Sequence, residues 1–310
     1  MIGVPLRGQL GNQMFRYAGA RVQAERLGVP LVISTKVPFF SVSTFALGRM
    51  PDFELFDAFP DLKIHALSRF MPAVNRLRSA GLIPKSVPFK ALFHPKQNLD
   101  MGEWNEMYDE RIWDVEPRTL VDACFFSEQY FQGWESDIRG WFSPPTQVAK
   151  AVDQNLATLP HSPDDMVAVH VRLTDYLVQN DINSDAQTGW ALPPSYYEDA
   201  LALVGQDTPI ALFSDDVQRA KSLLPREPAW TTAATAPVVD LFSMARFRNL
   251  IVANSTFSWW SGWLNADPKR RIIAPEFFIG FRHKRWVPND IKVKGWHYIE
   301  PQTNDEIVSA

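Results

Sequence analysis

Short apolar runs alternate with longer amphipathic runs in both halves of this chain, and this alternation constrains the fold more than any other feature. In the first half, residues 3–6 and 29–34 are strand-like, and the segment 14–28 between them has apolar positions at helical spacing. A strand, a helix and a strand of these lengths predict a βαβ unit with parallel strands. Because the alternation returns from Met166 onward, we expect an α/β fold with two Rossmann-like, doubly wound domains.

The length of the chain fits this division, since 310 residues can build two hydrophobic cores. Residues 143–165 are rich in proline and indicate the passage between the domains. We therefore expect a first domain over residues 1–150 and a second over residues 151–310. Directly before this passage, residues 127–142 are predicted to form one amphipathic helix.

Composition excludes several classes of protein. The net charge of -4 argues against a nucleic-acid partner, because such proteins usually carry a basic excess. Cys124 is the only cysteine in the sequence, which rules out an intrachain disulfide and a cysteine-based metal site. The N-terminus lacks a basic segment followed by an apolar run, and no apolar run approaches the roughly 18 residues of a membrane span. We expect a cytoplasmic protein.

The first polar cluster lies where a buried strand should end. The run Val167–Val171 is apolar apart from His170, and Arg172 follows it directly. Ligands of parallel sheets bind at the carboxyl ends of the strands. An arginine there suits a pyrophosphate or carboxylate, because its guanidinium grips two oxygens and stays charged. The alternative interpretation is an ion pair with Asp175 at the end of the strand.

A second polar cluster follows the strand-like run 250–253 and opens a predicted helix. The start of a helix with free N–H groups and hydroxyls is a ready site for an anion, and the alternative is a plain capped helix. The candidate ligands in this cluster are Asn254, Ser255, Thr256 and Ser258.

Two further polar clusters also stand between a strand and a helix. Ser214, Asp215 and Asp216 are either simple helix caps or groups that recognise a ribose or a base. The two acids are adjacent and do not fit an Asp-x-Asp spacing, so we expect no metal site. In the loop 8–13, which is not a G-x-G-x-x-G fingerprint, Asn12 and Gln13 are either caps of the helix that follows or neutral amides that bond the hydroxyls of a sugar. The candidates there are Gly11, Asn12 and Gln13.

Taken together, these clusters resemble the motifs of the α-1,2-fucosyltransferase family. "GQLGNQMFRYA" is similar to the family's G-G-L-G-N-Q-M-F-Q-Y-A, and "VHVRLTDYL" is similar to its H-x-R-R-x-D-Y. "YYEDAL" resembles the helix that follows, and "DLFSMARFRNLIVANSTFSWWSGWL" resembles the long motif that ends in N-S-[ST]-F-S-W-W-x-x-W-L. No motif is recognised in residues 36–120.

The resemblance implies a GT-B-like architecture, in which the two domains face a central cleft. It also implies an inverting transfer of fucose from GDP-fucose to the 2-hydroxyl of galactose in a glycan, with no cofactor and no metal. Arg172 would hold the β-phosphate, His170 would lie near the nucleotide, and Asp215 or Asp216 would lie near guanine or ribose. The serines and the threonine of the second cluster, with Asn254, would hold the pyrophosphate.

Asn12, Gln13 and Gly11 would face the fucose and the acceptor. Asp175 is a candidate for the catalytic base, but its spacing from Arg172 fits an orienting ion pair equally well. Two positions depart from the family pattern: Leu173 replaces the usual second arginine and Gln9 a second glycine. Another GDP-sugar, another hydroxyl, or a catalytically silent sugar-nucleotide binder therefore stay open as alternatives.

The acceptor is expected to be chosen by the first domain and by the loop 178–190. Residues 62–98 carry seven Lys or Arg and no Asp or Glu, whereas residues 99–117 carry seven acids and one arginine. The basic segment either pairs with the acidic one or lies against the inner face of a membrane that holds a lipid-linked glycan.

Overall fold

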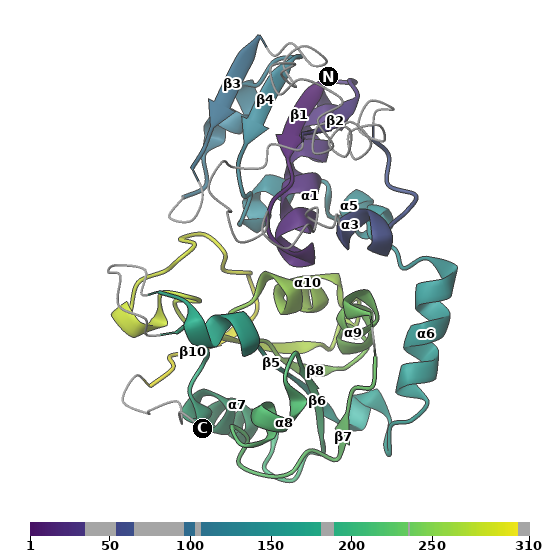
Figure 1. Ribbon diagram of the computed structural model, residues 1–310, viewed down its shortest axis with the longest axis vertical. Coiled ribbons are helices and arrows are strands. Elements are labelled where there is room, and N and C mark those ends of the chain that lie inside the picture. The colour runs from purple at the N-terminus through teal and green to yellow at the C-terminus, as the bar shows by residue number, and fades with distance from the viewer. Residues whose placement is uncertain (35–53, 65–95, 103–106, 181–188, 235, 303–310) are drawn as a thin grey trace, which may run out of the picture. The chain divides into compact units, whose positions relative to one another are not determined.

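The computed structural model describes residues 1–34, 54–64, 96–102, 107–180, 189–234 and 236–302. The chain forms two compact units, Met1–Ser143 and Pro144–Ala310. Each unit contains a sheet of parallel strands with helices packed against it (Figure 1). The predicted α/β class with two parallel sheets is therefore confirmed, and the central cleft between the domains stays a prediction.

The first unit has a sheet with the strand order β2-β1-β4-β3. Helix α1 (Leu10–Arg26) follows the first strand after a turn in which Gly8 has a φ of 71°, a conformation that favours glycine. Together with the two strands that flank it, α1 forms the βαβ unit that the sequence predicts. The strands are β1 (Ile2–Pro5), β2 (Leu31–Ser34), β3 (Gln97–Asp100) and β4 (Thr119–Asp122).

The predicted single helix over residues 127–142 is wrong. The segment forms a 3-10 helix, η3 (Glu128–Phe131), and a separate helix, α5 (Glu135–Trp141). Gly133 between them has a φ of 81°, which is incompatible with a continuous right-handed helix. Two more short helices of this unit are α3 (Glu54–Ala58) and η2 (Glu110–Asp114).

The second unit has a six-stranded sheet with the order β10-β9-β8-β5-β6-β7. Counted along the chain, this is the 3-2-1-4-5-6 order of Rossmann folds, and the direction of winding reverses between β5 and β8. Ligands bind outside the carboxyl ends of the strands at such a switch point. The strands are β5 (Val167–Val171), β6 (Ile210–Ser214), β7 (Trp230–Thr231), β8 (Asn249–Ile251), β9 (Arg271–Pro275) and β10 (His297–Ile299).

Helices cover both faces of this sheet (Figure 1). Helices α7 (Pro194–Val204) and α8 (Val217–Lys221) share one hydrophobic core with Val167, Val169 and Val171 of β5. Helices α6 (Thr146–Leu156) and α9 (Pro237–Met244) share a second core with Ala168 on the opposite face. Strand β5 is thus buried on both sides, which explains its continuous apolar run. The remaining elements are η4 (Pro163–Asp165), η5 (Thr174–Val178), α10 (Thr256–Leu264) and η6 (Phe281–His283).

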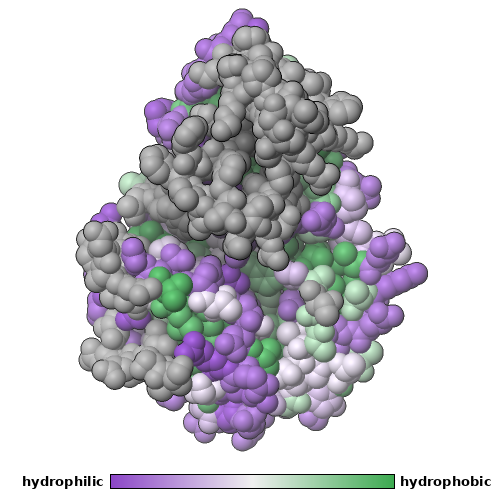
Figure 2. Space-filling model, viewed as in Figure 1, coloured by the Kyte–Doolittle hydropathy of each residue, from purple (hydrophilic) through white to green (hydrophobic). Residues whose placement is uncertain are grey.

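The division between the units falls at Ser143 and Pro144, rather than at the predicted residues 150 and 151. Helix α6, which spans the predicted boundary, packs against α9, and the Asn155 side chain donates a hydrogen bond to Ser243 Oγ at 3.2 Å. No helix in the described ranges is long and apolar enough to cross a membrane. Figure 2 shows hydrophilic residues interspersed with smaller hydrophobic patches on the visible described surface.

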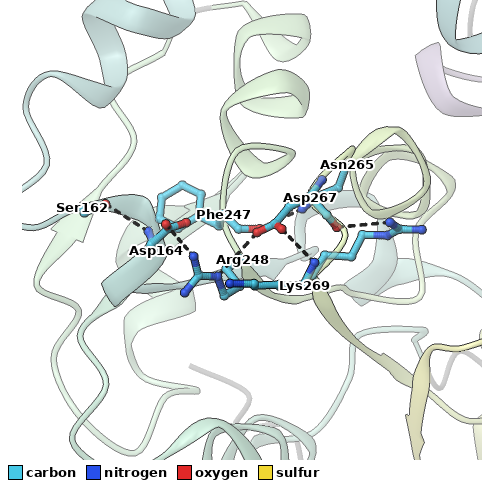
Figure 3. Close-up of polar contacts among 8 residues, drawn as sticks. Ser162, Asp164, Phe247, Arg248, Asn265, Asp267 and Lys269 are labelled. Atoms are coloured by element: carbon cyan, nitrogen blue, oxygen red, sulfur yellow. Dashed lines mark hydrogen bonds and ion pairs between the residues drawn. The ribbon is translucent and has the colours of Figure 1, made fainter.

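Ion pairs and hydrogen bonds link several side chains at the amino edge of the second sheet (Figure 3). Arg248, directly before β8, donates to Asp164 Oδ2 at 2.6 Å and lies 3.5 Å from Asp267 Oδ2. The main-chain N–H of Lys269 donates to Asp267 at 2.8 Å, and Asn265 donates to the carbonyl of Phe247 at 2.8 Å. This edge lies opposite to the carboxyl edge, where ligands of such sheets bind.

Candidate functional site

Three of the four predicted polar clusters meet at the carboxyl edge of the second sheet. Strand β5 lies between β6 and β8, and all three run parallel. Arg172 follows β5, Asp215 follows β6, and Asn254 follows β8 by three residues. The strand order therefore gathers side chains that are far apart in the sequence, on both sides of the topological switch point.

Arg172 is the centre of this group. Its guanidinium lies 2.7 Å from Asp175 Oδ1 and 3.3 Å from Asp215 Oδ2. The side chain of Arg172 is 17% exposed, whereas that of Asp175 is 42% exposed. The ion pair with Asp175, the alternative that the sequence left open, is thus present. Because Asp175 is more exposed than Asp215, its ion pair with the arginine is the more strongly screened by solvent.

Asp215 holds the loop after β5 in place. It accepts the main-chain N–H of Leu173 at 2.9 Å and the hydroxyl of Thr174, besides its ion pair with Arg172. Leu173 itself is 1% exposed and belongs to the hydrophobic core shared with α7. These contacts point to a positioning role for Asp215, and the predicted contact with guanine or ribose stays a prediction.

Ser214 and Asp216 make the capping contacts that the sequence offered as the simple alternative. Ser214 Oγ accepts the main-chain N–H of Asp216 at 3.1 Å. Asp216 is the N-cap of α8 and accepts the main-chain N–H of Arg219 at 3.1 Å. Both groups therefore stabilise the start of α8, and their predicted role in binding a nucleotide stays a prediction.

His170 is buried beneath this group. The pKa of the imidazole is lowered to about 3, mainly by burial; the charge of Asp215 raises this pKa and that of Arg172 lowers it, both by smaller amounts. The ring lies 5.6 Å from that of Phe257 in the first turn of α10. His170 is therefore neutral at physiological pH, and it contacts both the strand and the helix that form the site.

The start of α10 lies beside the loop that follows β5 and carries Arg172. Ser255 is the N-cap residue, but its side chain makes no capping hydrogen bond to the described helix. Asn254 is buried and donates from Nδ2 to the carbonyl of Trp190 at 2.8 Å. The hydroxyl of Ser258 lies 3.3 Å from the carbonyl of Ser255 and 3.4 Å from that of Ala253. Ser258 therefore bonds to main-chain carbonyls just before and at the start of α10, whereas Thr256 is half-buried in the first turn.

The fourth predicted cluster, Gly11, Asn12 and Gln13, lies in the first unit at the start of α1. Gln13 is buried; it donates to the carbonyl of Gly8 at 2.8 Å and accepts the main-chain N–H of Leu55 at 3.1 Å. The side chain of Asn12 packs so closely on Gly8 that a Cβ there would lie 2.4 Å from its Nδ2. Gln13 thus joins α1 to α3, and Asn12 stands over the turn.

Asp240 is a titratable group of this edge that the polar clusters do not include. It lies in the first turn of α9 and accepts the hydroxyl of Thr232, directly after β7, at 2.5 Å. Burial raises the pKa of its carboxyl group to about 6, against the smaller effect of that hydrogen bond. Such shifts gather at functional sites. The only signal in the sequence is a carboxylate at a helix start after a very short strand.

Within the described ranges, no group of three His, Cys, Asp or Glu side chains has the arrangement of a metal site. The groups at the site are an arginine at the edge of the sheet, a neutral imidazole, the start of a helix and several carboxylates. An arginine and a helix start both favour negative charge.

The chain is similar to several known proteins. Residues 88–300 match the sequence profile described as Glycosyl transferase family 11. The chain is 26% identical to the O-antigen biosynthesis glycosyltransferase WbnK of Escherichia coli, over 92% of this chain and 97% of that protein. It is 24% identical to an α-1,2-colitosyltransferase of Escherichia coli, over 87% and 89%. Among solved structures, fucosyltransferase NodZ from Bradyrhizobium has 16% identity, 84% and 92% coverage, and a TM-score of 0.42.

Proposed function

The chain belongs to glycosyl transferase family 11, and from this premise we propose that it transfers fucose from GDP-fucose to the 2-hydroxyl of a galactose in a glycan, with inversion. The observation that carries the proposal is Arg172 at the carboxyl end of β5, beside the start of α10 and at the switch point of a Rossmann-like sheet. The pyrophosphate of the donor suits that place, because both elements favour negative charge.

The chemistry requires such an arrangement. As the glycosidic bond breaks, negative charge builds on the β-phosphate of the leaving GDP. Arg172 and the main-chain N–H groups at the start of α10 would neutralise this charge in the proposed reaction, and no metal or cofactor is required. The loss of one oriented donor of this kind typically lowers the rate by a hundredfold or more, about 3 kcal/mol.

In this proposal, Asp175 is the partner of Arg172 only while no donor is bound. Without a ligand it lies 2.7 Å from Arg172, and the pyrophosphate would take its place. The ion pair with Arg172 gives Asp175 an orienting role and does not by itself make it a base. The base that activates the acceptor hydroxyl is therefore left unassigned. Leu173, at the family's second arginine, contributes packing rather than charge, since it is 1% exposed.

The acceptor is proposed to be a galactose-containing glycan, and the name of the O-antigen relative supports the part of this proposal that concerns a glycan. Asn12 at the start of α1 is the candidate to contact fucose or acceptor, because a neutral amide both donates and accepts. A lipid-linked acceptor and contact with the inner membrane face are part of the same proposal. Most of the basic segment 62–98 and of the loop 178–190 lies outside the described residues.

A second donor is favoured by a specific observation, the similarity to an α-1,2-colitosyltransferase. The same site would then transfer colitose in place of fucose. Parallel turnover measurements with the GDP derivatives of the two sugars decide between them, because the preferred donor has the higher kcat/KM.

Calorimetric titration with GDP and GDP-fucose, with and without EDTA, tests the donor site. We expect binding that is unchanged by EDTA, and Arg172→Ala should weaken it by about 2 kcal/mol, or about thirtyfold. Arg248→Ala is the matched control, because Arg248 also pairs with two aspartates, but at the amino edge of the same sheet. No binding by the wild type, or equal binding by both variants, contradicts the proposal.

A turnover assay separates an enzyme from a silent binder. We expect steady release of GDP from GDP-fucose only when a galactose-terminated acceptor is present. Tight binding of GDP-fucose with no release of GDP for any acceptor would instead favour a binder of sugar nucleotides.

A further inference from the structure

Two tryptophans of the first unit lie side by side, outside the polar clusters described above. Trp134 directly precedes α5, and Trp141 is the last residue of that helix, so about two helical turns place both on one side of it. Their ring centres are 6.3 Å apart, and the ring planes are tilted by 39°. Both residues are half-buried, so each indole keeps some surface in contact with solvent. The two rings therefore form one aromatic patch.

Buried groups hold Trp141 in place on one side. The guanidinium of Arg21 lies against it, with Cζ 4.5 Å from the ring centre, which is within the range of cation–π attraction. Arg21 is 4% exposed; it donates to the hydroxyl of Tyr17 and, from two nitrogens, to Glu25 at 3.0 and 2.7 Å. The ring of Tyr17 also meets that of Trp141 edge to face at 6.5 Å. The ring of Trp141 is thus fixed before a ligand arrives, which lowers the entropy cost of binding.

Trp134 does not stabilise the start of the helix that it precedes. It is the N-cap residue of α5, a position that favours Ser, Thr, Asp and Asn because their side chains bond to the first turn. The side chain of Trp134 makes no capping hydrogen bond. Packing is the structural alternative, but it accounts for only part of the indole, since the residue is half-buried. A residue that breaks a local preference in this way is expected at functional positions.

The charges around the two rings favour a neutral ligand. Glu135 and Asp137 in the first turn of α5 are exposed, and the side chain of Glu25 is 42% exposed, whereas Arg139 is half-buried. These carboxylates repel an anionic membrane surface or an acidic glycan, and they accept hydrogen bonds from hydroxyl groups. The C–H groups of a pyranose ring are weakly positive and suit the negative face of an aromatic ring. The combination matches a neutral hexose.

We propose that Trp134 and Trp141 form a subsite that binds a neutral hexose unit of the glycan acceptor by stacking. Trp141 supplies a fixed aromatic surface, and Trp134 supplies a second one beside it. Each indole also carries an N–H that can donate to a sugar hydroxyl. The role of the glycan as acceptor rests on the proposed function, whereas binding of the glycan does not require the donor site.

Saturation-transfer NMR with a neutral, galactose-terminated hexasaccharide, recorded without donor, tests the subsite. The wild type should bind it, and Trp134→Ala should raise the Kd about threefold to tenfold, which corresponds to one aromatic contact. Trp134→Phe should restore most of the affinity, because it keeps a ring. Trp113→Ala is the matched control and should leave the Kd unchanged. Trp113 is also a half-buried tryptophan of the first unit, with the Cζ of Arg26 6.0 Å from its ring centre.

The turnover assay separates a binding role from a purely structural one. Trp134→Ala should raise the KM for the hexasaccharide by the same factor, and it should leave kcat, the Kd for GDP and the melting temperature nearly unchanged. An unchanged KM, or a lower kcat with an unchanged KM, overturns the inference.

The outcomes distinguish this inference from the proposed function. If no acceptor leads to release of GDP, the proposed function is wrong, and the NMR measurement still decides whether the subsite exists. If GDP-fucose is turned over but the wild type does not bind the hexasaccharide, or Trp134→Ala binds it equally well, only the inference is overturned. It is also overturned if Trp134→Ala keeps this affinity but loses sedimentation with anionic phospholipid vesicles, because the patch is then a membrane contact.

Discussion

Leu173→Arg restores the arginine that the family carries at this position, and we expect it to destabilise the protein rather than improve donor binding. Leu173 is 1% exposed and packs in the core between β5 and α7, although it stands next to the exposed edge of the sheet. Its main-chain N–H is held by Asp215 at 2.9 Å. The loop is therefore fixed with this side chain pointing inward.

The size of the effect follows from this burial. Removing a buried leucine from its core loses about 1.5–3 kcal/mol of hydrophobic stabilisation. A buried guanidinium without a partner adds a penalty of several kcal/mol, even after the structure relaxes. We expect a loss of about 4 kcal/mol or more in the free energy of unfolding. For a unit of this size, that corresponds to a melting temperature lower by about 8 °C or more.

Thermal unfolding followed by circular dichroism measures this loss, and GDP calorimetry on the same samples measures donor binding. Leu173→Met is the control, because a swap that conserves volume should cost less than about 1.5 kcal/mol. A Leu173→Arg variant that melts like the wild type and binds GDP more tightly would refute the reasoning. It would show that this position faces the ligand and that the site lacks one charge.

Three further predictions concern other ionisable groups. Asp175→Asn should tighten GDP binding a few-fold, because the variant loses an exposed ion pair of about 0.2–1 kcal/mol that competes with the ligand for Arg172. Weaker GDP binding contradicts this prediction. Lost turnover with intact binding identifies Asp175 as the base. Burial lowers the pKa of His170 from 6.5 to about 3, so only the unfolded state binds this proton in that range. The free energy of unfolding should fall as pH falls through it, by up to about 1.4 kcal/mol per pH unit, and urea titrations of His170→Gln should lose that part of the slope. Arg248→Ala, which removes the network at the amino edge, should lower the melting temperature by a few degrees and leave the Kd for GDP unchanged; a changed Kd would mean that this edge is coupled to the site.

The sequence by itself determined the class of the fold and the edge of the sheet at which three of its polar clusters gather. Strand β5 is buried on both faces, so its run of apolar residues is uninterrupted and its end at Arg172 is visible. The carboxyl ends of parallel strands lie at one edge, so that polar residues after strands β6 and β8 could be expected near this arginine. The ion pair between Arg172 and Asp175 could also be predicted from the local sequence, because the two residues are three positions apart.

Local propensity failed at two places in the described structure. Ser255 has the residue type and the position of an N-cap, yet its side chain makes no capping hydrogen bond to α10. The segment 127–142 has the pattern of one helix, yet the backbone of Gly133 interrupts it with a φ of 81°. The glycine is visible in the sequence, but an isolated glycine inside a helical pattern is often tolerated, so it did not by itself predict the break.

Only the tertiary structure decided which partners meet. Asp215 reaches Arg172 because β6 pairs with β5 in the register that places Ser214 opposite Val171, and many strand orders fit the same alternation of elements. The inward direction of Leu173 was likewise decided by packing, since a residue just past a strand end can face the core or the edge. Local sequence encodes periodicity and burial, whereas strand order and register follow from the packing of both faces of the sheet at once.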